Sequence, residues 1–269
     1  MSEDQITSIS KGRHRDPFSF LGPHENQIRA WLPQARAAWV VSAWGSTPME
    51  STGVTGFYIA TFGTRPDGYS IRVELYSGEV RQFEDPYRFP PMLTAFELHL
   101  HGEGTNYESY RTLGAHLVNC EGVDGVRFAV WAPNAEVVSV VSDVNQWDRT
   151  RHPMRLRDGG IWELFMPGVG AGTNYKYSVL SRAHPLAELK EQDKSDPYGF
   201  FAEVPPRTAS IVWPLSNYGW NDGGWMEARA GRNWLREPVS AYEVHLESWM
   251  RGPFSQLMTY RELADKLTE

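Results

Sequence analysis

The chain has a single cysteine, Cys120, among its 269 residues, so no disulfide can form within it. A lone free thiol is typical of proteins from a reducing compartment. The sequence has no run of about 18 apolar residues that would span a membrane. Residues 1–11 are polar and lack the apolar stretch of a signal peptide. These absences predict a cytoplasmic protein that is not inserted in a membrane.

Positive charge is scarce as well, because 26 Lys and Arg residues face 33 Asp and Glu residues. No basic cluster stands out, which argues against nucleic acid as a partner. No glycine-rich phosphate loop follows a strand-like segment, and the 8 histidines form no ligand cluster, so we expect no cofactor and no metal. The 11 tryptophans are unusually many, and aromatic faces bind hydroxylated rings well. A neutral polysaccharide fits this composition best.

An internal repeat organises the chain. Four segments recur in the same order, Leu21–His24 as Leu113–His116, Ile28–Pro33 as Val126–Pro133, Gly56–Tyr58 as Gly160–Trp162, and Asp85–Tyr87 as Asp196–Tyr198. Each copy is about 100 residues long, the size of an independent domain. We therefore predict domains at 1–108 and 109–214, a linker at 215–238 and a different segment at 239–269.

Each copy has the pattern of an all-β domain. In the second copy the expected strands are Val126–Trp131, Ala135–Ser142, Ile161–Met166 and Asn174–Leu180. A glycine-rich turn at 167–173 separates the last two. Several short strands at this spacing predict two tandem immunoglobulin-like β-sandwich domains. A helical segment near Met92–His101 connects the copies.

The segment at 239–269 has a different character. Val239–Leu246 is apolar and prone to form a strand, and Thr259 with Glu262 makes the capping box of a following helix. This order predicts the first β/α unit of a larger α/β domain. A single unit cannot bury its own faces, so we expect the rest of that domain to be missing from this chain.

Three tryptophans allow a prediction from their neighbours alone. Trp131 and Trp162 lie inside predicted strands among apolar residues, so both are expected in the core. Trp44 occupies roughly the position in the first copy that Trp147 has in the second, but without the Asn, so we expect a structural role for it rather than a contact with sugar.

Six motifs occur along the chain in a fixed order: Asp16–Gly22, Asp85–Phe89, Phe128–Ala135, Gly160–Phe165, Lys194–Tyr198 and Tyr242–Leu246. Together they resemble bacterial glycogen branching enzymes of the α-amylase superfamily. The resemblance implies that the first copy is the extra N-terminal domain of these enzymes and the second their glycogen-binding domain. It also implies that 239–269 is the first β/α unit of the catalytic (β/α)8 barrel, which is incomplete here. Glu247 stands where the family commonly has Gly, and residues 252–258 diverge from its pattern.

Enzymes of this family transfer α-1,4-glucan segments to α-1,6 branch points by a retaining transglycosylation. Their catalytic Asp and Glu lie on later barrel strands, so the resemblance places no catalytic residue in this chain. We expect the chain alone to be an inactive monomer that binds α-glucan such as glycogen.

The resemblance also implies a sugar site. In related domains the Trp of an Asn-Xaa-Trp loop stacks on a glucose ring, and a Lys of a Tyr-Lys-Tyr strand assists. These positions are Asn145, Trp147 and Lys176 here. Trp147 can equally fold back onto the sandwich, and both interpretations stay open.

Two other functions are weighed against this one. One is a stand-alone α-glucan-binding protein, against which the apolar segment Val239–Leu246 argues, because an orphan strand favours aggregation. The other is the front part of a debranching or trehalose-releasing hydrolase, against which the duplication and the Tyr242–Leu246 motif argue.

Overall fold

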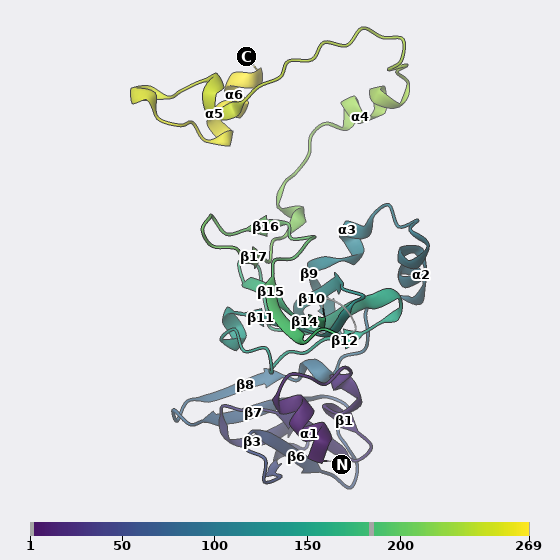
Figure 1. The fold of residues 1–269 in the computed structure, drawn as a ribbon, viewed down its shortest axis with the longest axis vertical. Helices are drawn as coiled ribbons and strands as arrows, with labels where there is room; N and C mark the ends of the chain where they lie inside the picture. The colour runs from purple at the N-terminus through teal and green to yellow at the C-terminus, as the bar shows by residue number, and fades with distance from the viewer. Residues whose placement is uncertain (1–2, 183–185, 269) are drawn as a thin grey trace. The chain divides into compact units, whose positions relative to one another are not determined.

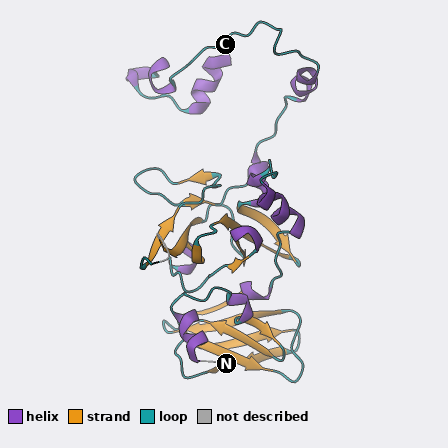
Figure 2. Ribbon diagram, turned by 45° about the vertical axis from the view of Figure 1, so that its right-hand side comes forward, coloured by secondary structure: helices purple, strands orange, loops and turns teal. Residues whose placement is uncertain are grey.

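The structure is a computed structural model that describes residues 3–182 and 186–268 (Figure 1). The chain forms two compact units, Met1–Asn217 and Tyr218–Glu269. Strands occur in the larger unit, whereas the described part of the smaller unit contains only helices and loops (Figure 2). No helix among the described residues has the length and apolar character needed to cross a membrane.

The first sandwich follows a short helix, α1 (Glu3–Ser10), and the 3-10 turn η1 (Pro17–Ser19). Its strands are β1 (Gly22–His24), β2 (Gln27–Trp31), β3 (Ala35–Ser42), β4 (Gly45–Pro48), β5 (Glu50–Ser51), β6 (Phe57–Thr61), β7 (Tyr69–Leu75) and β8 (Val80–Glu84). They form two four-stranded sheets, β1-β2-β6-β5 and β4-β3-β7-β8. Both sheets contribute to one core, in which Ile28, Val40 and Ile71 are buried.

A connector joins the two sandwiches. It contains η2 (Pro86–Arg88), α2 (Ala95–Glu103) and α3 (Ser109–Thr112). The helix predicted near Met92–His101 is therefore confirmed. The buried Glu163 of the second sandwich holds the connector, because its Oε1 accepts the N–H groups of Met92 at 2.6 Å and Leu93 at 2.8 Å.

The second sandwich, like the first, consists of two sheets. Its elements are β9 (Gly114–Cys120), β10 (Val123–Trp131), β11 (Ala135–Ser142), η3 (Asp143–Asn145), β12 (Arg155–Leu156), η4 (Asp158–Gly160), β13 (Ile161–Pro167), β14 (Asn174–Arg182), β15 (Leu189–Lys194), β16 (Phe201–Ala202) and β17 (Ser210–Ile211). One sheet has the order β12-β13-β10-β9, and the other has β11-β14-β17-β16 with β15 also paired to β14. The predicted all-β sandwiches are confirmed.

The sequence repeat corresponds to a repeated contact in the two cores. Tyr69 donates its hydroxyl to Asp85 Oδ2 at 2.7 Å, and Tyr175 donates to Asp196 Oδ2 at 2.7 Å. In each case the other carboxylate oxygen accepts the backbone N–H two residues further along the chain. Desolvation raises the pKa of both aspartates, that of Asp85 to about 6. These hydrogen bonds let each copy bury a carboxyl group beneath its closing turn.

Trp162 is confirmed as a core residue, since it is fully buried. The prediction for Trp131 is wrong, because its side chain is 54% exposed. Val126, Phe128 and Val130 of β10 face the core, and alternation along the strand turns the next residue to the other face. Trp131 Nε1 donates to the Gly159 carbonyl at 3.0 Å on that outer side.

The smaller unit departs from the barrel prediction. After η5 (Leu215–Asn217), which ends the larger unit, it contains α4 (Gly223–Ala230), α5 (Leu246–Trp249), η6 (Pro253–Ser255) and α6 (Tyr260–Thr268). Residues 241–245 have no regular secondary structure and α5 begins at Leu246, so the strand predicted over Val239–Leu246 is wrong. A parallel strand needs neighbouring strands for its backbone hydrogen bonds, and residues 218–268 supply none.

Two further predictions for the C-terminal residues have different outcomes. The helix α6 and its capping box are confirmed, because Thr259 N–H donates to Glu262 Oε2 at 2.7 Å and Thr259 Oγ1 accepts from the Glu262 N–H at 3.4 Å. The predicted linker at 215–238 is less irregular than expected, since α4 lies within it.

We expect Gly160→Ala to destabilise the larger unit. Gly160 has φ +81°, and a Cβ there would lie 2.6 Å from Pro133 Cα. The left-handed backbone alone costs about 1–2 kcal/mol for a residue with a Cβ, and the contact with Pro133 adds to this cost. Urea unfolding of Gly160→Ala should show the loss, whereas Gly170→Ala, with nothing within 4 Å of its Cβ, should not. Equal stability of the two variants would contradict this account of the turn.

Candidate functional site

The loop after β11 carries Trp147 at the surface. Gln146 and Trp147 both have positive φ, +59° and +60°. Such a conformation is unfavourable for residues with a Cβ, so the surrounding contacts must hold it. The Trp147 N–H donates to the Ser142 carbonyl at 3.0 Å, and the side chain remains 41% exposed. The exposed fraction leaves part of the indole available to a ligand.

Asn145 holds this loop from the inside. Its side chain is fully buried, and its Oδ1 accepts the Ser142 N–H at 2.9 Å. Its Nδ2 lies 2.8 Å from the Val140 carbonyl and 2.8 Å from His152 Nδ1. The side chain therefore lies beneath the loop, which changes the role expected of Asn145 from contacting sugar to positioning the loop.

The buried amide also sets the protonation of His152. Since Asn145 Oδ1 accepts a backbone N–H, its Nδ2 is the donor, and His152 Nδ1 must accept. The ring is then neutral and carries its proton on Nε2. Burial, followed by the charge of Arg151, lowers the pKa of His152 to about 3.

Asp143 ties the loop to the neighbouring strand β14. Its Oδ1 accepts from Trp147 Nε1 at 3.2 Å, and its Oδ2 accepts from Asn174 Nδ2 at 3.0 Å. Lys176 lies two residues further along β14, on the same sheet face as Asn174. Lys176 Nζ donates to Thr208 Oγ1 at 2.8 Å. We call Asp143, Trp147, Asn174 and Lys176 the Trp147 platform.

Sequence reasoning missed two members of this platform. Asp143 was detectable as the first residue after a predicted strand, and Asn174 by its two-residue spacing from Lys176. Their connection across two strands required the register, in which Val141 pairs with Lys176.

The first sandwich contacts the same loop. Gln34 Nε2 donates to Gln146 Oε1 at 2.5 Å, beside Trp147 in the chain. Trp31 Nε1 donates to Thr150 Oγ1 at 3.2 Å on the other side of the loop. The loop is thus held by side chains from both sandwiches.

The described residues of the first copy form no equivalent platform. Trp44, in the turn between β3 and β4, is 66% exposed, so it does not have the structural role expected from its position. The register places Ser70 opposite Val41, where the second copy has Lys176 opposite Val141. The first sandwich therefore lacks the cation at this position.

The platform combines groups suited to binding. It offers a partly exposed indole face, an amide and an ammonium group, and the oxygens of its one carboxylate are both hydrogen-bonded. In residues 3–182 and 186–268, no group of three or more His, Cys, Asp or Glu could hold a metal ion. An exposed tryptophan beside polar side chains on a β-sandwich is the arrangement of a carbohydrate-binding module.

Comparison with known proteins agrees with this class. Residues 112–199 match the family described as carbohydrate-binding module 48 (isoamylase N-terminal domain). Residues 2–87 match the family described as alpha-1,4-glucan branching enzyme GlgB, N-terminal domain. The chain belongs to the 1,4-alpha-glucan branching enzyme family and corresponds to its N-terminal region, which confirms the resemblance seen in the sequence.

Two relatives match nearly the whole chain. The 1,4-alpha-glucan branching enzyme GlgB of Rubrobacter xylanophilus is 49% identical over 98% of this chain, and that of Paramagnetospirillum magneticum is 46% identical over 97%. The chain spans 37% and 35% of the length of these relatives. Among solved structures, the pullulanase from Bacillus acidopullulyticus is 22% identical, with a TM-score of 0.33 over 64% of this chain and 19% of that one.

We expect His152 to make stability depend on pH. Its folded pKa of about 3 lies below the ordinary value of 6.5, so between these values the unfolded state binds more protons. The free energy of unfolding should therefore fall as pH decreases through this window. Urea titrations of wild type and His152→Gln would isolate the effect, because Gln retains an acceptor but does not titrate. Asp85 has a raised pKa and acts in the opposite direction, but equally in both proteins. The same loss of stability in both would contradict the prediction.

Proposed function

We propose that this chain is the glycan-binding N-terminal region of a 1,4-alpha-glucan branching enzyme, and that its second sandwich binds α-glucan at the Trp147 platform. The observation that carries the proposal is the exposed indole of Trp147. Two hydrogen bonds hold Trp147 in this position. Its indole N–H donates to Asp143, and its backbone N–H donates to Ser142 in the turn that Asn145 supports.

The chemistry of the platform suits a glucosyl unit. The C–H face of a pyranose ring is apolar and packs against an indole face, while its hydroxyls donate and accept hydrogen bonds. Asn174 and Lys176 lie on the strand beside the loop and supply donors for those hydroxyls. In this proposal Asn145 positions Trp147, and Trp147 and Lys176 contact the sugar.

The proposed partner is a neutral polymer such as glycogen, bound by a monomer in the cytoplasm. A single aromatic platform gives modest affinity, but a branched polymer offers many chain ends close together. Repeated engagement raises the effective affinity without new contacts. The expected domains, 1–108 and 109–214, would then act as one body that presents the platform.

The relatives are named for branching α-1,4-glucan, and we extend that activity to the protein of which this region forms part. A retaining transfer between glycosyl units requires two carboxyl groups about 5–5.5 Å apart. The Trp147 platform has one carboxylate, Asp143, and both of its oxygens are bonded. We therefore propose that the chain alone binds glucan without transferring it.

Trp147→Ala should weaken glycogen binding. We expect an apparent dissociation constant at least about tenfold higher, equivalent to about 1.4 kcal/mol, because the variant removes the stacking face. Affinity electrophoresis with glycogen in the gel measures the change. Trp131→Ala is the matched control, since Trp131 is 54% exposed but lies on β10 in the opposite sheet. Equal retardation of the two variants would refute the platform.

The chain alone should leave the structure of amylose unchanged. Incubation with amylose followed by iodine staining should give no lasting loss of colour beyond that of a protein-free sample. A progressive loss of colour would show catalysis and overturn the proposed role as a binding region.

A further inference from the structure

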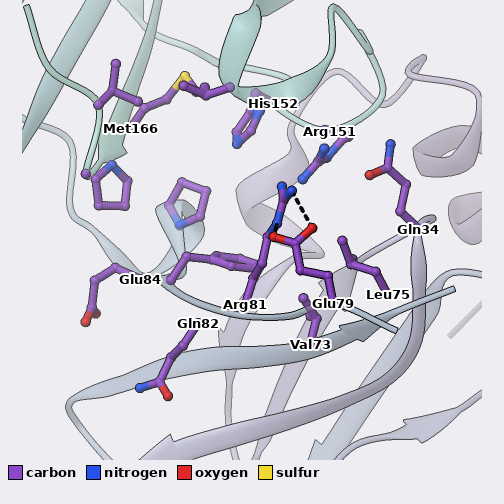
Figure 3. Close-up of a pocket in the computed structure, with 16 residues that line it drawn as sticks. Gln34, Val73, Leu75, Glu79, Arg81, Gln82, Glu84, Arg151, His152 and Met166 are labelled. Atoms are coloured by element: carbon purple, nitrogen blue, oxygen red, sulfur yellow. Dashed lines mark hydrogen bonds and ion pairs between the residues drawn. The ribbon is translucent and has the colours of Figure 1, made fainter. Parts of the chain in front are cut away.

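A cavity lies between the two sandwiches, apart from the Trp147 platform. It has a volume of about 490 Å³ and is lined by β7 and β8 of the first sandwich and by the Trp147 loop and the turn after β13 of the second (Figure 3). This volume is within the range of about 300–1,000 Å³ found for small-ligand sites. Val144 lines the cavity from the same loop that carries Trp147.

The walls of the cavity include apolar patches from both sandwiches. Val73, Leu75 and Phe83 line it from the first sandwich, and Met166 and Val169 line it from the second. Figure 3 shows Val73 and Leu75 on the side opposite Met166. A ligand with an apolar face can therefore be held between them.

The polar groups at the centre come from both sandwiches as well. Arg81 forms two hydrogen bonds to Glu79, Nε to Oε1 at 2.7 Å and Nη2 to Oε2 at 2.8 Å. Figure 3 shows this pair extending into the cavity toward Arg151. Among the described residues, the Arg151 guanidinium has no hydrogen bond or ion pair, although desolvation lowers its pKa. A partly desolvated guanidinium without partners favours a ligand that can accept hydrogen bonds.

His152 supplies a second unused donor. Its Nδ1 accepts from Asn145, so the proton is on Nε2. In the described part of the chain Nε2 has no hydrogen-bond partner, and the ring lies at the wall of the cavity beside Arg151 (Figure 3). This donor is fixed in position by the buried amide beneath it.

The formal charges of the lining residues cancel. Glu79 and Glu84 balance Arg81 and Arg151, and His152 is neutral. The cavity thus presents both donors and acceptors without a net charge that would select an anion. Hydroxyl groups use both kinds of partner, and a pyranose ring also has apolar C–H faces for the walls.

We propose that the cavity between the sandwiches is a second binding site for a neutral polyhydroxylated ligand, the end of a short α-1,4-glucan chain. The proposal rests on the glucan binding proposed above and adds a site to which the first sandwich contributes directly. The first sandwich then holds the Trp147 loop through Gln34 and also binds glucan itself through Arg81.

The test is calorimetric titration with maltotriose, using the full chain. Trp147→Ala removes the platform, and binding of maltotriose should persist in this variant. Adding Arg151→Met, which breaks no hydrogen bond or ion pair in the described chain, should weaken that residual binding at least about tenfold. Adding Arg81→Met from the opposite wall should have the same effect, and it breaks only the exposed pair with Glu79.

Matched controls are Arg149→Met and Arg36→Met in the same Trp147→Ala background. Arg149 pairs with Glu191 at 2.6 Å and Arg36 with Glu74 at 2.7 Å, and neither lines the cavity. Both should leave the residual binding unchanged. A thermal unfolding midpoint for each variant confirms that it is folded, and the two cavity variants provide independent readings from separate sandwiches.

The outcomes separate the two proposals. Loss of all maltotriose binding in Trp147→Ala alone would overturn the cavity site and leave the platform intact. Binding that is unaffected by Trp147→Ala but lost in Arg151→Met would overturn the platform and support the cavity. Binding of inorganic phosphate in place of maltotriose would show an anion site and overturn the assignment of a neutral ligand.

Discussion

Both candidate sites depend on the buried amide of Asn145. The Asn145 side chain is fully buried. Its Oδ1 accepts the Ser142 N–H, and its Nδ2 donates to the Val140 carbonyl and to His152 Nδ1. A buried polar group left unpaired costs about 1–3 kcal/mol, so these bonds act together to fix one loop conformation. Above the amide the chain turns through positive φ and presents Trp147 to solvent. On the other side it fixes the ring of His152, which lines the cavity.

The duplication supplies a scaffold rather than two copies of a function. Both sandwiches bury an aspartate against a tyrosine hydroxyl, and both bring a glycine against a proline, Gly56 on Pro33 and Gly160 on Pro133. A Cβ on either glycine would clash with its proline, and a buried carboxylate without a hydrogen-bond donor would be unfavourable. Both contacts therefore require particular residues. The outer sheet face has no such requirement, and there the copies differ: Lys176 in the second corresponds to Ser70 in the first.

The first sandwich has a different part in the proposed function. It contacts the loop of the second sandwich through Gln34 and Trp31, which orders the loop before a ligand arrives. A loop ordered in advance loses less conformational entropy on binding, so more of the contact energy becomes affinity. In the proposed function, the N-terminal copy contributes to glycan binding by ordering this loop, although its described residues offer no exposed tryptophan held beside a lysine.

Much of this protein was predictable from its sequence. The repeat is visible as segments that recur in the same order. The strand Ala135–Ser142, the core position of Trp162 and the capping box at Thr259 follow from alternation and cap chemistry, which act over a few residues. The positions of Trp147 and Lys176 on neighbouring elements were also identified from motifs in the sequence.

Other features were decided only by the tertiary structure. Cross-strand register decides which face Trp131 occupies. Hydrogen bonds to residues that are not adjacent in sequence place Asn145 inside the loop. Val239–Leu246 has strand-forming composition, but a strand exists only where neighbours complete its hydrogen bonds. The cavity between the sandwiches could not be predicted for the same reason, since its walls come from segments far apart in the sequence that meet only when the two domains pack. Local chemistry determined the elements, and long-range pairing decided which side chains remained free to bind.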